Sequence, residues 1–360
     1  MIFHPRLLHN GPIRKPRALL RALTRSARYL LPLILLGLAV HLILPRLATI
    51  EQSLGVIRQM AWWAVALAVL AQLLSYLGSG YLLRALVAIA GQRLSVVRGT
   101  LIFTAASSVG LSGGGPLGNF TVTYRWLRGS RVSAEGAMLA GSLPNVFYDS
   151  IMAATGIFGL LHLLIVHELT LLQVVGFGFT LLMLSLIAGV ALWGVHHRPR
   201  LTTLAVRVAE RWAVLRHRPY DPAATETAIG RWFSALDALR AGGWRGPTLG
   251  AILNTGFDML TLYLLFVAAG HKVSPGVMLA GYGLPLLLGK VAIWPGGIGL
   301  VEATMAALYD GLGVPHGVTV VVIIAYRFLS FWLPLLVGLP LIPYLQHVCG
   351  SESDESGVTA

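Results

Sequence analysis

Long apolar stretches, separated by short polar segments that carry arginines, run through most of the 360-residue chain. A helix needs about 20 predominantly apolar residues to cross the hydrocarbon core of a bilayer. The apolar stretch at about 134–166 is longer than one span needs, and we expect Pro144 to kink it because proline interrupts the helical hydrogen-bond ladder. In all, the pattern predicts six membrane-spanning helices, at about 29–44, 61–83, 134–166, 169–195, 248–269 and 316–339.

Two further apolar stretches, 100–112 and 275–293, are interrupted by helix-breaking residues. The first would rise only about 20 Å as a helix, too little to cross the bilayer core. Backbone broken inside a bilayer is tolerated only where protein or water satisfies its polar groups. We therefore predict two re-entrant hairpins that return through 120–127 and 300–312, with breaks that line a cavity. The breaks contain Gly113, Gly114 and Gly115 in the first hairpin and Pro295, Gly296 and Gly297 in the second.

The basic residues predict the orientation of these elements. Residues 1–28 carry seven basic side chains and no acidic one, which places the N-terminus in the cytoplasm by the positive-inside rule. Arg84, Arg93 and Arg98 place the loop after the second span on the same side. No small-residue cleavage site follows the basic N-terminus, so we expect the first span to be retained. We expect both termini on the cytoplasmic side of a bacterial inner membrane.

With these orientations the two halves of the chain, about 29–166 and 169–339, have the same order of elements and opposite topology. The glycines echo this order, because the cluster Gly113-Gly114-Gly115 through Gly129 parallels Gly296-Gly297-Ile298-Gly299 through Gly313, an offset of 184 residues. Inverted repeats with interrupted helices are typical of transporters whose site lies near the bilayer midplane. The fold class predicted is an all-α polytopic membrane protein with six spans and two re-entrant hairpins in an inverted repeat. The alternative is a chance recurrence of glycines.

Composition supports one integrated membrane domain, 29–345, followed by a disordered cytoplasmic tail, 346–360. The chain is 56% hydrophobic and only 11% charged, against about 25% charged in soluble domains. Its net charge of +13 lies in arginines that flank the apolar runs, so it indicates membrane orientation and not nucleic-acid binding. Cys349 is the single cysteine, and no cysteine cluster or other metal-ligand spacing is present. We expect no metal and no cofactor.

One sizeable polar insert, 196–247, contains nine arginines. Two apolar stripes at helical spacing run through it, which predicts two basic amphipathic helices. Such helices lie on anionic membrane surfaces. The alternative is a pair of helices that cap the bundle. The stripes are Leu201, Leu204, Val208, Trp212 and Leu215, then Ile229, Trp232, Phe233, Leu236 and Leu239.

The candidate site combines the two breaks with charged residues in apolar sequence. A helix that begins near Leu300 presents free backbone N–H groups, and such a terminus binds anions. Arg125 and Arg327 would suit a lipid phosphate, because guanidinium groups bind phosphate in a bidentate manner. Lys290 would add a point charge.

Glu302 does not fit simple phosphate binding. It is a candidate for capping its own helix, for pairing with Arg327 or Lys290, or for carrying a proton. Asp149 and Asp258 are secondary candidates, because ionisable groups inside a membrane are often functional. The alternatives to a functional role for these charged residues are structural ion pairs, helix caps and solvated interfacial charges.

The second break and its surroundings resemble the C-terminal signature of the lysylphosphatidylglycerol synthase transmembrane family, which are flippase-like integral membrane proteins. The resemblance covers about residues 25–345. In multiple peptide resistance factors this domain is fused to a synthase domain that aminoacylates phosphatidylglycerol, and we expect no such domain in this chain. The resemblance therefore implies lipid translocation without lipid synthesis. One departure is Asn119, which lies where many relatives carry an acidic residue. The matching segments are residues 294–303, 311–315 and 325–334, with Ser112–Gly115 and Tyr124-Arg125 in the first half.

Three functions remain open from the sequence. The first is translocation of an anionic phospholipid or polyprenyl-linked lipid between leaflets. The second is a lipid-modifying enzyme, against which we find no metal spacing, paired carboxylates, nucleophile elbow or nucleotide loop. The third is a scaffold that docks a partner membrane enzyme through 196–247.

Overall fold

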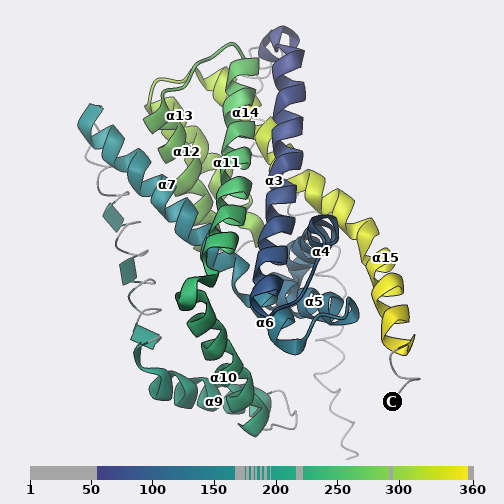
Figure 1. The fold of residues 1–360 in the computed structure, drawn as a ribbon. Helices are drawn as coiled ribbons and strands as arrows, with labels where there is room; N and C mark the ends of the chain where they lie inside the picture. The colour runs from purple at the N-terminus through teal and green to yellow at the C-terminus, as the bar shows by residue number, and fades with distance from the viewer. Residues whose placement is uncertain are drawn as a thin grey trace, which may run out of the picture. The chain divides into compact units, whose positions relative to one another are not determined.

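The computed structural model describes residues 55–166, isolated positions between 175 and 194, and residues 196–215, 222–291 and 295–355. Every regular element within these residues is a helix (Figure 1). Residues 56–360 cluster as one unit, which is the part described below. The helices are α3 (Trp62–Ile89), α4 (Val96–Val109), α5 (Gly115–Gly129), α6 (Ala134–Ser142), α7 (Pro144–Val166), α9 (Arg198–Leu215), α10 (Pro222–Ala238), α11 (Arg245–Ala268), α12 (Pro275–Val291), α13 (Leu300–Gly311), α14 (His316–Arg327) and α15 (Leu333–Glu355).

Among the described residues, four helical stretches are long and apolar enough to cross a membrane, so the chain is a multi-pass membrane protein. Each coincides with one of the six predicted spans. The predicted span 29–44 and most of 169–195 lie outside the described residues, as does the basic segment 1–28. The four stretches are Trp62–Ile89, Ala134–Ile165, Arg245–Ala268 and His316–Val348.

Two of these stretches are interrupted where the chain carries proline. Leu143 separates α6 from α7, and Pro144 is the first residue of α7, where its missing N–H costs no helical bond. The predicted kink is therefore confirmed. In the last span a π-helical turn, Phe328–Trp332, joins α14 to α15. Pro334 explains this turn, because its ring clashes with the carbonyl four residues earlier and its nitrogen cannot donate.

The end of the last span differs from the prediction. α15 continues to Glu355, through ten residues that we predicted as the start of a disordered tail; residues 356–360 lie outside the described part. No glycine or proline lies between Tyr344 and Cys349, which favours continuation of the helix there, and the helix then passes Gly350 to end at Glu355. The predicted end of α3 also falls short, since the helix passes Arg84 and ends before Gly91, whose φ is +72°.

Small residues allow α3 and α11 to pack closely and antiparallel. A Cβ atom on Gly78 would lie 2.6 Å from the backbone nitrogen of Asn254, and one on Gly250 would lie 2.7 Å from Cα of Leu82. The amide of Asn254 donates to the carbonyl and hydroxyl oxygens of Ser75, at 3.1 and 2.9 Å, and to Ser79 Oγ at 2.9 Å. Close backbones joined by polar side chains are the usual means of helix association in lipid.

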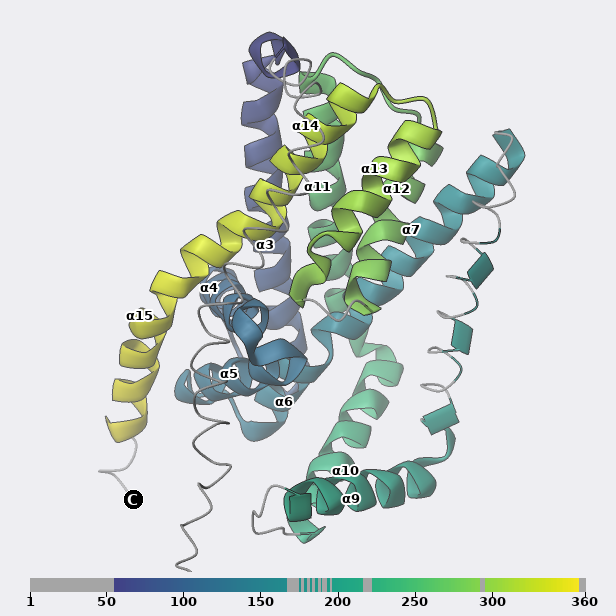
Figure 2. The same ribbon diagram turned by 180° about the vertical axis from the view of Figure 1, so that it is seen from behind.

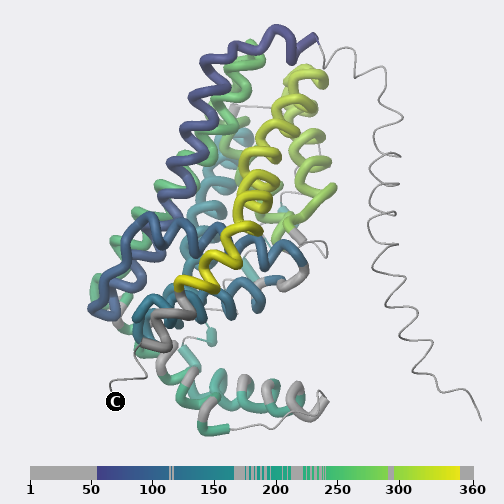
Figure 3. The backbone as a smooth tube through the Cα atoms, turned by 90° about the vertical axis from the view of Figure 1, so that its right-hand side faces the viewer, coloured from purple at the N-terminus to yellow at the C-terminus, as the bar shows by residue number. Residues whose placement is uncertain are grey.

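α7 and α12 pack in the same way. A Cβ atom on Gly159 would lie 2.2 Å from the backbone nitrogen of Ala280, and one on Gly283 would lie 2.6 Å from that of Gly156. α15 runs beside α4 (Figure 3). There Ser108 Oγ donates to the Pro334 carbonyl at 3.1 Å.

α12 and α13 form a helical hairpin around the second predicted break. A Cβ atom on Gly281 would meet the ring of Tyr309, and Gly289 lies against Val301, so the two helices are antiparallel. The loops before α12 and after α13 lie at the same end of the pair (Figure 2). α4 and α5 contact each other around the first break, the turn Gly110–Gly114.

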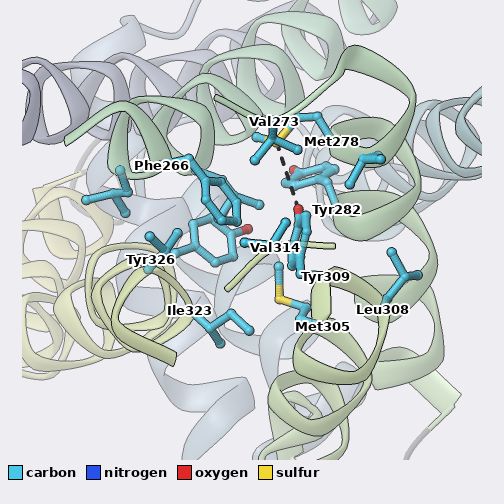
Figure 4. Close-up of a cluster of buried hydrophobic side chains, with 14 of the residues drawn as sticks. Phe266, Val273, Met278, Tyr282, Met305, Leu308, Tyr309, Val314, Ile323 and Tyr326 are labelled. Carbon is cyan, nitrogen blue, oxygen red and sulfur yellow. Dashed lines mark hydrogen bonds between the residues drawn. The ribbon is translucent and has the colours of Figure 1, made fainter. Parts of the chain in front are cut away.

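The apolar core is divided into two clusters of buried side chains. One, the α12–α14 cluster, includes Tyr282, Tyr309 and Tyr326, and Tyr309 Oη donates to Met278 Sδ at 3.8 Å (Figure 4). The other, the α4–α6 cluster, also includes Leu345 of α15. α3, α7 and α11 contribute buried side chains to both clusters, so these three helices connect them.

Candidate functional site at the two helix breaks

The two breaks lie beside each other. Cα atoms of the turn Gly110–Gly114, between α4 and α5, come within 8 Å of those of the turn Pro295–Gly297, between α12 and α13. These turns include Gly113 and Gly114 on one side and Gly296 and Gly297 on the other. The structure therefore brings the interrupted backbone of both hairpins to one place.

The second break needs glycine for its backbone geometry. Gly296, Gly297 and Gly299 have φ values of +68°, +64° and +85°, a region that side chains disfavour. A Cβ atom on Gly296 would lie 2.1 Å from the ring of Phe331, and one on Gly297 would lie 2.6 Å from Cα of Gly289. At the first break Gly115 has φ of +57°, with open space where a Cβ would lie.

Arg327 joins the second break to α14. Its side chain is buried, and its Nε donates to Glu302 Oε1 at 2.6 Å. One terminal nitrogen donates to the Gly296 carbonyl at 3.0 Å, and the guanidinium lies 4.5 Å from the ring centroid of Phe331. Arg327 thus satisfies a carbonyl that the broken helix leaves without a helical partner, which is the requirement for interrupted backbone in a membrane.

Glu302 caps α13 and pairs with Arg327 at the same time. Its Oε2 accepts from the backbone N–H of Gly299 at 2.7 Å, as expected for an acidic residue three positions after the N-cap. Two of the roles left open by the sequence are therefore combined in one carboxylate. This carboxylate lies at the helix terminus where we predicted a phosphate, so the protein supplies its own anion there.

Lys290 and Asp149 form a separate ion pair that links α12 to α7. Both side chains are about 40% exposed, at 40% and 43% respectively. The predicted alternative of Lys290 paired with Glu302 is therefore not observed.

Arg125 lies apart from these groups. It is exposed on α5, ten residues after Gly115, which is about 15 Å along a helix. In the described part of the chain, no hydrogen bond or ion pair joins it to Arg327, Lys290 or Glu302. Asn119 is nearer the break, where its Cβ lies against Gly110 and its side-chain oxygen accepts from Thr123 at 3.3 Å.

Asp258 is the centre of a polar cluster that the sequence does not reveal. Its carboxylate accepts from Gln72 Nε2 at 2.9 Å, from the Tyr282 hydroxyl at 2.8 Å and from the Tyr326 hydroxyl at 2.7 Å. A glutamine in the apolar run of α3 is the one sequence signal that would have pointed to a buried polar partner.

Two cavities lie elsewhere on the described surface. One of about 550 Å³ lies between α11 and α12 and is lined mainly by apolar residues, among them Met259, Tyr263 and Met278. The other, of about 500 Å³, lies where α3 ends and α4 begins and is lined by Arg84 and Arg93. Over the described residues no group of three or more potential metal ligands gathers.

The polar insert contains the two predicted amphipathic helices, α9 and α10. Arg198 binds Asp237 through two hydrogen bonds of 2.9 and 2.5 Å, and these raise the pKa of the guanidinium above its usual value. Phe233 of α10 is buried, whereas Leu204 and Val208 of α9 are 49% and 59% exposed. The second stripe therefore packs in part against protein, as in the capping alternative, and the first presents apolar side chains outward.

Comparison with known proteins gives one family and several relatives. The family model of the lysylphosphatidylglycerol synthase TM region matches residues 22–338. A UPF0104 membrane protein of Methanothermobacter thermautotrophicus is 32% identical over 87 residues, which are 24% of this chain and 26% of that protein. A UPF0104 membrane protein of Pyrococcus horikoshii is 31% identical over 83 residues, 23% of this chain and 25% of that protein. These alignments span about a quarter of the length of the curated relatives.

Proposed function

Because the chain belongs to the family of the lysylphosphatidylglycerol synthase TM region, as its residues predict, we propose that it moves lipids between the two leaflets of a membrane. The substrate is an anionic phospholipid or a polyprenyl-linked lipid, and the protein is not an enzyme. The observation that carries this proposal is the meeting of two glycine-broken hairpins, with a buried arginine paired to a partly exposed glutamate beside them.

The proposal includes the full topology. Residues 29–345 form one domain with six spans and two re-entrant hairpins in an inverted repeat. The antiparallel pair α12–α13, whose two outer loops lie at one end, supports the second hairpin. Both termini lie on the cytoplasmic side of a bacterial inner membrane, which the basic N-terminal segment and the arginines of the loops support.

In this function the lipid phosphate and the carboxylate of Glu302 bind the guanidinium of Arg327 in turn. Glu302 holds the guanidinium while no substrate is present, so the buried charge is never left without a partner. An arriving phosphate takes over the guanidinium, and the returning carboxylate helps to release it. The partly exposed Lys290–Asp149 pair and the break glycines complete the substrate contacts.

Replacing Glu302 with glutamine tests this exchange, because the variant keeps the shape of the side chain and removes the competing charge. We expect tighter binding of anionic lipid and leaflet exchange about tenfold slower, a change of about 1.4 kcal/mol. The measurement is exchange of a fluorescent lipid in proteoliposomes, read by chemical quenching from outside.

Glu135→Gln is the matched control, because Glu135 is exposed and also lies in the first turn of a helix, α6. Its exchange rate is expected to equal that of the wild type. Wild-type rates no faster than those of protein-free vesicles would contradict the function. Unchanged exchange in both Glu302→Gln and Arg327→Ala would contradict the assigned site.

The exposed stripe of α9 supports a second element of the proposal, contact with an anionic membrane surface. A fluorophore on Val208→Cys in a Cys349→Ser background is expected to be quenched by nitroxide-labelled lipid in nanodiscs that contain anionic lipid. Glu210→Cys is the control, since position 210 is exposed and lies about 200° around the helix from 208. Equal quenching at both positions would contradict membrane contact. No quenching at either would favour docking of a partner membrane enzyme.

A further inference from the structure

A carboxylate lies inside one of the candidate spans without a cationic partner. Asp258 belongs to α11, and its hydrogen-bond donors come from three other helices, α3, α12 and α14. In the described part of the chain it forms no salt bridge. A charge in such a place is costly unless it is paired or can be neutralised.

The groups that face Asp258 are buried and neutral, with one exception. Gln72, Tyr282 and Tyr326 are 2%, 1% and 1% exposed, while Asp258 itself keeps partial exposure. Tyr76 of α3 also faces it, and donates its hydroxyl to the Leu329 carbonyl. Arg327 of α14 acts on it through space, but its guanidinium is bound to Glu302 and Gly296.

One end of the Gln72 amide faces Asp258, and among the described residues the other end has no hydrogen-bond partner. Its Nε2 donates to Asp258, whereas its Oε1 is buried without any donor. Leaving a buried acceptor unsatisfied costs about 1–3 kcal/mol. The two ends of an amide look alike, so their assignment follows the hydrogen-bond network. If the amide turns over, Oε1 faces Asp258 and accepts a hydrogen from its protonated carboxyl group.

The Asp258 carboxyl group therefore has a hydrogen-bond partner on Gln72 in both protonation states. The ionised carboxylate accepts from the amide nitrogen, and the protonated carboxyl donates to the amide oxygen. The two tyrosine hydroxyls keep their acceptor, Oδ2, in both states. One O–H bond forms at Oδ1 as a proton arrives from water and breaks as it leaves, and no other bond changes.

We propose that Asp258 is a proton-binding site and that its protonation and deprotonation accompany each passage of lipid. The second half of this statement rests on the proposed function, and the first half does not. The coupling follows from position, because Tyr326 precedes Arg327 on α14 and Tyr282 lies on α12, the first helix of the second hairpin. A change of charge at Asp258 thus reaches the elements that hold the second break.

The proton site is tested by infrared difference spectroscopy of the purified protein in nanodiscs during a pH titration. We expect the C=O stretch of a protonated carboxyl group in the wild type, its loss in Asp258→Asn, and its retention in the exposed control Glu135→Gln. Gln72→Leu keeps the carboxyl and removes its partner, and should move the titration midpoint by about one pH unit. A band unaffected by Asp258→Asn, or a midpoint unaffected by Gln72→Leu, would overturn the proton site.

The coupling is tested by leaflet exchange in proteoliposomes with a pH gradient across the membrane. We expect the wild-type rate to change at least several-fold when the gradient is reversed, and the Asp258→Asn rate to be independent of it. Exchange insensitive to the gradient in the wild type would overturn the coupling. If the infrared band behaves as expected and the wild type exchanges no lipid, the proton site stands and the proposed function fails.

Discussion

Arg327→Met is expected to destabilise the folded protein by about 3–5 kcal/mol and to abolish leaflet exchange. The substitution keeps most of the apolar length of the side chain, so the loss comes from polar contacts. It leaves the Gly296 carbonyl and one oxygen of Glu302 without their donors. Breaking one side of a buried ion pair is costly because the remaining charge stays in place. The measurement is the fraction of native protein that survives heating in detergent, together with the exchange assay.

A double variant separates stability from function. Glu302→Gln with Arg327→Met removes both charges, and we expect it to recover a large part of the lost stability, because no unpaired charge remains. It should not recover exchange, since the guanidinium that binds phosphate is absent. Arg58→Met, at an exposed position, is the stability control. A double variant as unstable as Arg327→Met would show that the arginine acts through packing on Phe331 and not through its charge.

Gly297→Ala is expected to disrupt the α12–α13 hairpin, at a cost of about 2–5 kcal/mol. The added methyl group would lie 2.6 Å from Cα of Gly289, which is backbone and cannot rotate away. The residue would also have to keep a φ of +64°, which a side chain disfavours. Thermal stability and leaflet exchange should fall together in this variant.

Gly299→Ala is the matched control for this prediction. Gly299 has φ of +85°, but nothing lies within 4 Å of its would-be Cβ. Backbone strain alone costs about 1–2 kcal/mol, so this variant should lose clearly less stability than Gly297→Ala. Equal losses in the two variants would show that the close approach of α12 to the break does not limit the fold.

The local features of the fold could be read from the sequence because they depend on neighbouring residues. Four of the predicted spans coincide with long apolar helices, since hydropathy over about 20 residues decides whether a segment enters a bilayer. The break between α6 and α7 follows from Pro144 in the same way. The positions of the two glycine breaks also follow from residue type, because glycine and proline disfavour helix interiors wherever they stand.

The partners of the charged residues could not be read from the sequence. Gln72 and Asp258 are 186 residues apart, and Lys290 and Asp149 are 141 apart. Hydropathy places a residue along the membrane normal but does not say which neighbouring helix it faces. The capping role of Glu302 is local and could be predicted from the sequence. Its contact with Arg327 depends on how α14 packs beside the break.

The π-helical turn Phe328–Trp332 is a point at which the last span can bend. α14 lies within the α12–α14 cluster, and α15 reaches the α4–α6 cluster through Leu345. Within the described residues, α3, α7 and α11 also contribute buried side chains to both clusters. A movement of one cluster against the other would therefore bend the last span at this turn, one residue after Arg327.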